Sequence, residues 1–382
     1  MVLWQDFVAH LQNVRRAVIS LTNDTAKMQQ NAGLCDGDEN FVDFRFVNLV
    51  DGIMSMTTSY ADIQSIVADD FAIMDKQVFG SLNSKVQLVM KVSEHVINAG
   101  GKRMRPLITL LTARMLSDVQ SAQAMELAAI TEMLHTATLV HDDVIDASGL
   151  RRGRPTANAT WDNATAVLVG DYLIARSFNL LVGFNNLPLL KLFSDGTCDI
   201  AEGEVLQLQH QHNPETTEHD YLQIIDGKTS RLFMMATKGA ALLQGRDELL
   251  DDLGAFAYHF GNAFQMIDDV LDFTGDAAVM GKNLGDDLAE GKPTLPIIKT
   301  LEILKNSDTQ NYDKLRIAVQ TGKVLDAGEL IALVQQSGAL DYCKKRALDE
   351  TKLAQAALSK LPENRYREGL YLLTELASAR LV

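Results

Sequence analysis

Two long apolar segments of helical period each end in an acidic pattern, and this pair constrains the fold more than any other feature. The segments cover residues 122–146 and 252–273, and they end in the patterns DDVID at 142–146 and DDVLD at 268–272. Because each segment is apolar nearly all round, we expect both to form buried central helices. Parallel helices across one core would bring the two acidic patterns to the same rim of a bundle.

The spacing within each acidic pattern indicates divalent metal binding. Residues four apart share one face of a helix, so Asp142 is expected beside Asp146 and Asp268 beside Asp272. Carboxylates at this density inside an apolar helix need cations to neutralise them. Magnesium suits such an edge because it accepts a few carboxylates together with phosphate oxygens. One acidic pattern at a helix end is commonly a solvated turn or a cap, but two copies favour a metal site.

Basic side chains gather at turns near these acidic patterns, as the binding of diphosphate groups requires. The stretch GGKRMRP at 100–106 places three cations after two flexible glycines. Lysine offers phosphate a point charge, and arginine offers a two-pronged fork. Further candidates are a histidine two helical turns before the first acidic pattern, two arginines after it and three later lysines: His135, Arg151, Arg152, Lys228, Lys282 and Lys292. The combination predicts a magnesium-dependent diphosphate site.

The composition excludes several other classes of protein. A formal net charge of −15 over 382 residues disfavours nucleic acids and anionic membranes as partners. Cys35, Cys198 and Cys343 are far apart and odd in number, which is typical of a reducing compartment without a disulfide framework. No apolar run is expected to reach the roughly 18 residues of a membrane helix, and the first residues lack a cationic signal-peptide region. We therefore expect a soluble, cytoplasmic protein without stable membrane insertion.

The chain is predicted to divide at about residue 55. Residues 1–55 carry a loose helical stripe and an acidic loop but no feature of a site. They are either an N-terminal extension of unknown role or the result of a start assigned upstream of Met54 or Met56. Residues 56–382 show apolar positions at three- and four-residue spacing, with turn signals between them and little strand-like alternation. One all-α domain is the simplest account of this part.

At these residues the chain closely resembles the trans-isoprenyl diphosphate synthases, and within them the bacterial long-chain polyprenyl type that makes octaprenyl diphosphate. The resemblance covers about residue 60 to the C-terminus. It is carried by AGGKRMRP at 99–106, LHTATLVHDDVIDASGLRRGRPTAN at 134–158, VLVGDYL at 167–173, AEGEVLQL at 201–208, KTSRLF at 228–233, AFQMIDDVLDF at 263–273 and GKNLGDDLAEGKPTLP at 281–296.

The resemblance implies a single bundle of mostly antiparallel helices around a deep central cavity, usually as a homodimer. It also implies binding residues for two substrates, isopentenyl diphosphate and an allylic diphosphate such as farnesyl diphosphate. The isopentenyl site would be Lys102, Arg105, His135 and Arg152, and the allylic site would be Arg151, Lys228, Thr229, Gln265 and Lys282. Magnesium, about three ions per site, would be held by Asp142, Asp146 and Asp268, with Asp143, Asp269 and Asp272 beside them.

The implied reaction is a head-to-tail condensation. The allylic C–O bond breaks, the double bond of isopentenyl diphosphate attacks the resulting cation, and a proton is lost to the departing pyrophosphate. Repetition would give a long-chain trans-polyprenyl diphosphate, of eight units by resemblance, for a quinone side chain. Helical geometry places the small residues Ala137 and Thr138 just beneath the diphosphate, with Leu134 and Thr131 deeper. Phe178 is the candidate floor of this chain-length pocket, although an ordinary core phenylalanine is the commoner interpretation.

Two other functions stay open from the sequence alone. A class I terpene cyclase ionises an allylic diphosphate with similar metals, but it needs no isopentenyl site, so Lys102 and Arg105 count against it. A non-catalytic subunit of a heteromeric synthase would lose acidic or basic motif residues, and this chain retains them. A prenyltransferase is therefore the expected function.

Overall fold

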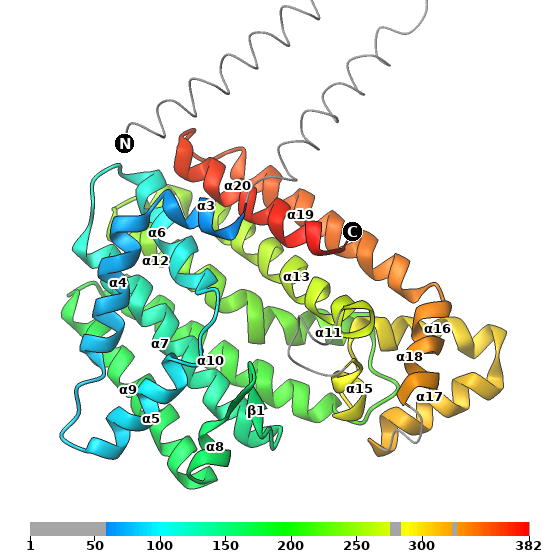
Figure 1. The fold of residues 1–382 in the computed structure, drawn as a ribbon. Coiled ribbons are helices and arrows are strands. Elements are labelled where there is room, and N and C mark those ends of the chain that lie inside the picture. Colours follow the sequence, from blue (N-terminus) through cyan, green and yellow to red (C-terminus); the bar gives the residue numbers. More distant parts are fainter. Residues whose placement is uncertain (1–58, 276–283, 323–326, 382) are drawn as a thin grey trace, which may run out of the picture. The chain divides into compact units, whose positions relative to one another are not determined.

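The computed structural model describes residues 59–275, 284–322 and 327–381, and residues 57–382 form one compact unit. The predicted extension, residues 1–55, lies outside the described residues. The described part is a bundle of helices with one two-stranded ribbon (Figure 1). The all-α fold class expected from the apolar periodicity is therefore confirmed.

Eight helices form the first half of the described chain. They are α3 (Tyr60–Ser65), α4 (Ala68–Ser81), α5 (Gln87–Ile97), α6 (Met104–Leu116), α7 (Ala122–Ile145), α8 (Ala157–Thr160), α9 (Asn163–Gly183) and α10 (Leu187–His210).

The second half continues in the same way. It contains α11 (Glu218–Ile225), the π-helical turn η1 (Asp226–Ser230), α12 (Arg231–Leu243), the 3₁₀ turn η2 (Asp247–Leu249), α13 (Leu250–Thr274), α15 (Asp286–Ala289), α16 (Leu295–Ser307), α17 (Thr309–Thr321), α18 (Ala327–Gln336), α19 (Ala339–Leu358), α20 (Arg365–Ser378) and the 3₁₀ turn η3 (Ala379–Leu381).

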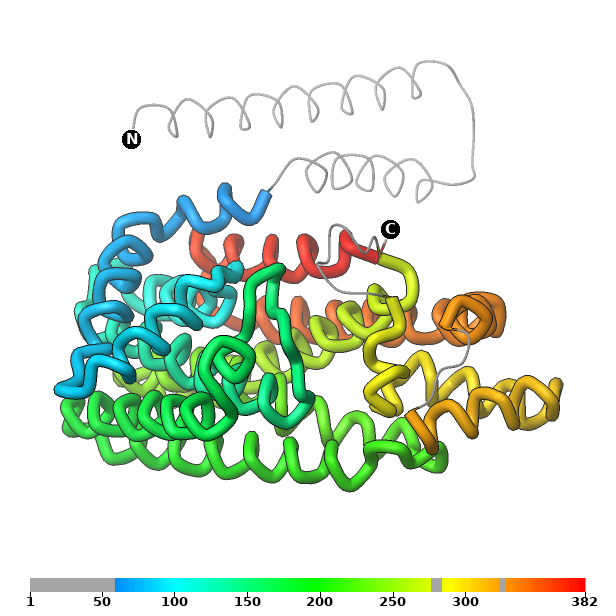
Figure 2. Tube along the Cα trace, turned by 60° about the horizontal axis from the view of Figure 1, so that its bottom comes forward, coloured from blue at the N-terminus to red at the C-terminus, as the bar shows by residue number. Residues whose placement is uncertain are grey.

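The two apolar segments that dominate the sequence form α7 and α13. Ser121 caps α7 by accepting a hydrogen bond from the Ala124 N–H at 3.2 Å. α7 packs against α4, α6, α9 and α12, whereas α13 packs against α12, α19 and α20. Figures 1 and 2 show α19 and α20 running along one side of α13. Helices on several sides explain why both segments are apolar nearly all round, and each ends in its acidic pattern.

A tight hairpin follows α7 and carries Arg151 and Arg152, the two arginines that follow the first acidic pattern. Its strands β1 (Leu150–Arg151) and β2 (Arg154–Pro155) are antiparallel. Arg152 and Gly153 connect them with φ values of 53° and 74°. Positive φ at both central residues is the turn geometry that matches the twist of a hairpin. The sequence predicts a loop here, and the hairpin instead fixes the position of both arginines beside the end of α7.

One described helix, α9, is long and apolar enough to cross a membrane by length and composition, and a third of its apolar window, 33%, is buried. This corrects the expectation that no apolar run approaches that length. α9 packs against α7, α5 and α8. Buried core helices pass the same test, so the finding is weak evidence for a membrane span.

Candidate active site

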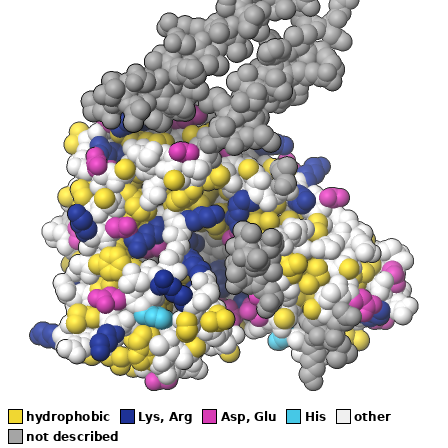
Figure 3. Space-filling model, in the orientation of Figure 1, with side chains coloured by type: hydrophobic (Ala, Val, Ile, Leu, Met, Phe, Trp, Pro, Cys, Tyr) yellow, Lys and Arg dark blue, Asp and Glu magenta, His cyan; other side chains and the backbone are white. Residues whose placement is uncertain are grey.

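A cavity of about 860 Å³ opens between the acidic ends of α7 and α13. Its wall comes from the start of α6 and the loop before it, from α7, the β1–β2 hairpin, η1 and α13, and from single residues of α10, α15 and η3. Lys and Arg side chains gather across the middle of the face drawn in Figure 3. Most of the residues predicted from the sequence line this cavity: Lys102, Arg105, His135, Thr138, Asp142, Arg151, Arg152, Lys228, Thr229, Gln265, Asp268 and Asp269.

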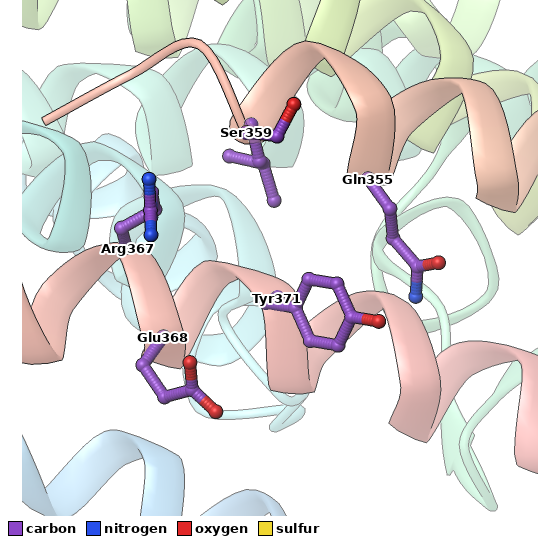
Figure 4. A pocket seen from close by; sticks show the side chains of 6 residues that line it. Gln355, Ser359, Arg367, Glu368 and Tyr371 are labelled. Atoms are coloured by element: carbon purple, nitrogen blue, oxygen red, sulfur yellow. The ribbon is translucent and has the colours of Figure 1, made fainter. Parts of the chain in front are cut away.

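A smaller pocket of about 210 Å³ lies between α19 and α20 (Figure 4). Its guanidinium group, from Arg367, donates a hydrogen bond to the Leu361 carbonyl at 2.9 Å and so helps to hold the fold. The pocket contains none of the predicted site residues; it is lined by Gln355, Leu358, Ser359, Arg367, Glu368 and Tyr371. Of these two pockets, the larger one contains the acidic and basic residues predicted from the sequence.

Arg105 is a largely buried cation on the wall of the large cavity. Its guanidinium lies 4.6 Å from the centre of the Phe233 ring, and its Nε is buried without a hydrogen-bond partner in the described part of the chain. Burial lowers the pKa of Arg105 to about 10, so the side chain stays charged at neutral pH. A buried donor without a partner is costly, and an anion bound in the cavity would satisfy it.

His135 and Lys102 lie on the same cationic side of the cavity. Burial, reinforced by Arg105 and Arg152, holds the pKa of His135 well below its usual value, so its imidazole is neutral. Burial also lowers the pKa of Lys102, and the nearby Arg380 adds to that effect. Lys102, Arg105 and Arg152 crowd together here near the carboxylate of Glu132, and an anion bound among them would neutralise the remaining positive charge. The arrangement therefore suits a diphosphate.

The first acidic pattern is held by basic side chains from three other segments. Asp142 Oδ2 lies 3.5 Å from Lys228 Nζ, and Asp146 Oδ2 accepts a hydrogen bond from Lys292 Nζ at 2.8 Å. Asp143 is buried, which raises its pKa, and the Arg151 guanidinium opposes that shift by donating to Asp143 Oδ1 at 2.8 Å. Asp142 lies on the cavity wall, whereas Asp143 and Asp146 do not. The predicted metal and diphosphate residues are thus direct neighbours.

Lys228 is presented by a π-helical turn, and such turns occur frequently at functional sites. A Cβ on Gly203 would lie 2.8 Å from the Lys228 backbone nitrogen, so only glycine lets α10 pack this closely on η1. The close packing brings Glu204 within 2.8 Å of Lys228 Nζ. Although burial opposes it, attraction from Asp142 and Glu204 raises the pKa of Lys228. The lysine is therefore a firmly charged group on the cavity wall.

The second acidic pattern divides into one half-buried and two buried carboxylates. Asp268 lines the cavity and pairs with Arg380 from η3 at 2.8 Å. Asp269 accepts hydrogen bonds from the Tyr221 hydroxyl at 2.7 Å and from Gln265 Nε2 at 2.8 Å. Burial, and then repulsion from Asp287, raises the pKa of Asp269 to about 8. Asp268 is therefore the readier donor to a cation in the cavity.

The two remaining motif residues on this wall continue the same network. Thr229 Oγ1 donates to Gln265 Oε1 at 2.9 Å, so Gln265 connects Thr229 to Asp269. Asp272 is fully buried, and its Oδ2 accepts a hydrogen bond from the Asp287 N–H at 3.3 Å. These contacts orient the wall of the cavity around Asp268.

The donor set fits magnesium, although the carboxylates form no closed cage. In the described ranges, no three His, Cys, Asp or Glu side chains gather closely enough to hold a metal ion by themselves. Magnesium needs no such cage, because it is usually bound through one or two carboxylates, substrate phosphates and water. Asp142 and Asp268 offer hard oxygen donors to one cavity from two different helices. The residues present therefore fit magnesium bound together with a diphosphate.

Most of the chain matches one family of known proteins. Residues 86–331 match the family model described as polyprenyl synthetase. The chain is 60% identical over 320 residues to the all-trans-nonaprenyl-diphosphate synthase (geranyl-diphosphate specific) of Rhodobacter capsulatus, covering 84% of this chain and 98% of that protein. It is 39% identical over 323 residues to the octaprenyl diphosphate synthase of Escherichia coli (strain K12), covering 83% and 98%. The chain belongs to the polyprenyl synthetase family.

Solved structures confirm the isoprenoid synthase fold of this family member. A polyprenyl synthase from Caulobacter crescentus CB15, complexed with calcium and isoprenyl diphosphate, matches with a TM-score of 0.79 and 37% identity over 85% of this chain and 98% of that one. A decaprenyl diphosphate synthase from Rhodobacter capsulatus matches with a TM-score of 0.79 and 38% identity over 85% and 100%. The predicted activity class is also confirmed: the protein is a prenyltransferase, a trans-polyprenyl diphosphate synthase.

The predicted chain-length pocket of the synthase is only partly reached by the cavity. Thr138 lines the wall, and its Oγ1 donates to the His135 carbonyl at 2.8 Å. The other predicted residues of this pocket pack outside the cavity: Ala137 is fully buried in the main core, Thr131 is buried with its hydroxyl on the Ala128 carbonyl, and Leu134 and Phe178 belong to a separate apolar cluster. Their role stays a prediction, and Lys282 lies outside the described residues.

Sequence reasoning missed several residues of this site. Glu132 lies on the wall among the cations, with Oε2 buried and without a hydrogen-bond partner in the ranges described. Glu204 and Arg380 hold Lys228 and Asp268, and Tyr221 holds Asp269. Glu132 could have been found, because it lies one helical turn before His135 on the same face. Arg380 and Tyr221 carry no local signal, since only tertiary packing brings them to the cavity.

Proposed function

We propose that this protein is a magnesium-dependent, long-chain trans-polyprenyl diphosphate synthase that condenses isopentenyl diphosphate head-to-tail onto an allylic diphosphate, with a product destined for a quinone side chain. One observation carries the proposal. Asp142 and Asp268, from two different helices, line a single cavity together with the cations Lys102, Arg105 and Arg152. Lys228, 3.5 Å from Asp142, adds a further cation to this cavity, as the binding of two diphosphates requires.

The cationic groups divide into two sets in this proposal. Lys102, Arg105 and Arg152 bind the diphosphate of isopentenyl diphosphate, and neutral His135 donates one N–H to it. Support comes from the buried Nε of Arg105, which has no hydrogen-bond partner in the described part of the chain. Lys228, beside Asp142, binds the allylic diphosphate together with Arg151 and with Lys282. Fixed cations at these two places orient the substrates before reaction, which removes much of the entropic barrier.

The reaction forms one C–C bond for each C–O bond broken. The allylic C1–O bond breaks, C1 bonds to C4 of isopentenyl diphosphate, and diphosphate and one proton leave. Lys228 and Arg151 stabilise the negative charge that develops on the leaving diphosphate. Thr229 and Gln265, hydrogen-bonded to each other at 2.9 Å, place polar atoms near the reacting carbons. The buried helices α7 and α13 keep water from the cation.

Magnesium would be bound by Asp142, Asp146 and Asp268, with Asp143, Asp269 and Asp272 supporting them. Bound there, it supplies neutralising charge to the allylic diphosphate. Support comes from the hard oxygen donors on the cavity wall and from the solved relative, which holds calcium and isoprenyl diphosphate. Asp143 and Asp269 act through Arg151 and Gln265, to which they are hydrogen-bonded.

The proposed product has eight or nine isoprene units. Relatives at 60% and 39% identity are named for nonaprenyl and octaprenyl products, and the first is named for geranyl diphosphate. Geranyl and farnesyl diphosphates are therefore both candidate primers. The wall of the pocket agrees with a long product, because Thr138, which lines it, is small.

A homodimer completes the proposal. Apolar side chains are exposed along α9 and α10, namely Val167, Leu168, Val182, Leu187, Val205 and Leu208. A second copy of the chain would cover these side chains, since exposed apolar surface commonly marks protein contacts. The proposed location is the cytoplasm; support comes from Cys343, which is buried as a free thiol, and Cys198, which is free and exposed.

Product chromatography tests this function. Purified protein is incubated with magnesium, labelled isopentenyl diphosphate and either geranyl or farnesyl diphosphate. Long-chain labelled products from at least one primer are expected. Cyclised hydrocarbon without incorporation of the label would indicate a terpene cyclase, and protein inert with both primers would indicate a non-catalytic subunit. Sedimentation of the wild type against the variant Leu168→Glu tests the dimer, which the charge should dissociate.

A further inference from the structure

Two residues after the end of α10, His212 adopts a backbone conformation that residues with a Cβ rarely take. His212 has a φ of 62°, in the left-handed region. A residue with a Cβ adopts this region only where the surroundings hold it there, and such positions often serve function. The contacts of His212 with two other segments explain why the conformation persists.

His212 and the residue before it hold the turn that follows α15. The His212 N–H donates to the Gly291 carbonyl at 2.8 Å, and Gln211 Nε2 donates to the Glu290 carbonyl at 2.7 Å. His212 Nδ1 lies 3.0 Å from the Val319 carbonyl near the end of α17. Gln211 and His212 thus contact the carbonyls of Glu290 and Gly291 in the turn and that of Val319 in α17.

Two glycines make room for the imidazole. Gly291 and Gly322 have φ values of 70° and 62°. A Cβ on Gly291 would overlap the His212 ring, and a Cβ on Gly322 would lie 2.9 Å from its Cε1. Each glycine is therefore required both by its own backbone and by the ring beside it. His212 fills a recess that this chain builds specifically for it.

The turn held by His212 carries a charge to the predicted metal site. Lys292 follows Gly291 directly, and its Nζ lies 2.8 Å from Asp146 and 2.7 Å from Glu290. α15 spans only four residues, which is too short for a helix to be stable without outside contacts. Outside contacts must therefore fix where Lys292 lies.

We propose that His212 is a positioning residue: it locks the turn at 285–292 so that Lys292 stays over Asp146, where the allylic diphosphate and its metal bind. The inference rests on the proposed function for the identity of that ligand. The evidence for the lock itself is the set of contacts that His212 makes with Gly291, Val319 and Gly322, none of which involves a substrate. It accounts for a strained histidine that touches no substrate.

Hydrogen exchange on the metal-free protein tests the lock without any substrate. In His212→Ala, amides of residues 285–292 should exchange about tenfold faster than in the wild type. The backbone hydrogen bond to the Gly291 carbonyl remains, but the turn loses the imidazole that packs against Gly291 and connects it to the Val319 carbonyl. Gly322→Ala should act similarly by displacing the ring. His212→Asn should restore much of the protection, since asparagine tolerates a left-handed backbone and carries a donor. Unchanged exchange in both His212→Ala and Gly322→Ala would overturn the lock.

Steady-state kinetics test the positioning role. His210→Ala is the matched control, because His210 also lies at the end of α10 but its Nδ1 contacts Thr216 Oγ1 at 3.1 Å. His212→Ala should raise the KM for the allylic diphosphate about fivefold and change the isopentenyl KM less than about twofold. Equal changes in both KM values, or none, would overturn the positioning role. Wild-type protein without condensation activity would refute the proposed function, while the exchange result would still decide the lock.

Discussion

Lys228 lies 3.5 Å from Asp142, so a lysine predicted for the diphosphate and an aspartate predicted for its metal are neighbours on the cavity wall. The two residues reach this position from η1 and α7, which are far apart in the chain. Their pairing gives the acidic wall a cation of its own before any ligand binds. Each partner can be tested separately.

Asp142→Ala should lower turnover about a thousandfold, because loss of one metal carboxylate removes several kcal/mol of charge stabilisation. The fold should survive, since Lys228 keeps Glu204 as a partner at 2.8 Å. Turnover and thermal unfolding would be measured side by side. Asp195→Ala, which removes an exposed partner of Lys191, is the control. Turnover within about tenfold of the wild type would show that Asp142 does not bind the metal.

Glu204→Gln should weaken binding of the allylic diphosphate. Its carboxylate is the closer of the two acidic partners of Lys228. Loss of this charge-assisted hydrogen bond, about 1.5–3 kcal/mol, frees the lysine and should raise the allylic KM roughly tenfold or more. Glu202→Gln, an exposed neighbour on the same helix, is the matched control. If the two variants have the same KM, Glu204 does not position Lys228.

His135 should make stability fall with acid. Its pKa is well below the usual value in the folded protein, whereas the unfolded chain should protonate near pH 6.5. Below that pH the unfolded state binds more protons, so the free energy of unfolding falls by up to about 1.4 kcal/mol per pH unit. Denaturant unfolding of wild type and His135→Gln between pH 7 and 5 should show a shallower loss in the variant. Parallel curves would mean that His135 is not buried as a neutral ring.

Thr138→Tyr should shorten the product, because Thr138 lines the cavity and a phenol ring would fill the space beneath the diphosphate. Ala137→Tyr places the same ring in a fully buried core position. It should therefore cost about 1–3 kcal/mol of stability in addition to any effect on length. Chromatography of labelled products distinguishes the two. Product of wild-type length from Thr138→Tyr would place the wall elsewhere.

The sequence predicts the parts of the fold that depend on local pattern. The segments expected at 122–146 and 252–273 form helices Ala122–Ile145 and Leu250–Thr274. Periodicity locates them because burial on several sides requires apolar residues on several faces. The two acidic patterns lie at the C-terminal ends of these helices, as predicted.

Contacts between distant segments could not be predicted in this way. Lys292 and Asp146 are 146 residues apart, and no local pattern indicates that they pair. Arg380 lies at an ordinary helix end in the sequence, yet it reaches Asp268. The close approach of α10 to the turn that presents Lys228 requires Gly203 and Gly227, where the two backbones touch, which is a tertiary effect. The sequence likewise gives no signal for His212, because its contacts are with Gly291, Val319 and Gly322, which are distant in the chain.

Anomalous diffraction from crystals grown with manganese and a non-hydrolysable allylic thiodiphosphate tests the central claim most directly. Manganese accepts the same oxygen ligands as magnesium. We expect metal peaks within about 2.0–2.2 Å of carboxylate oxygens of both Asp142 and Asp268, with the diphosphate between them. Peaks at only one of the two acidic patterns, or a diphosphate bound outside the cavity, would contradict the account.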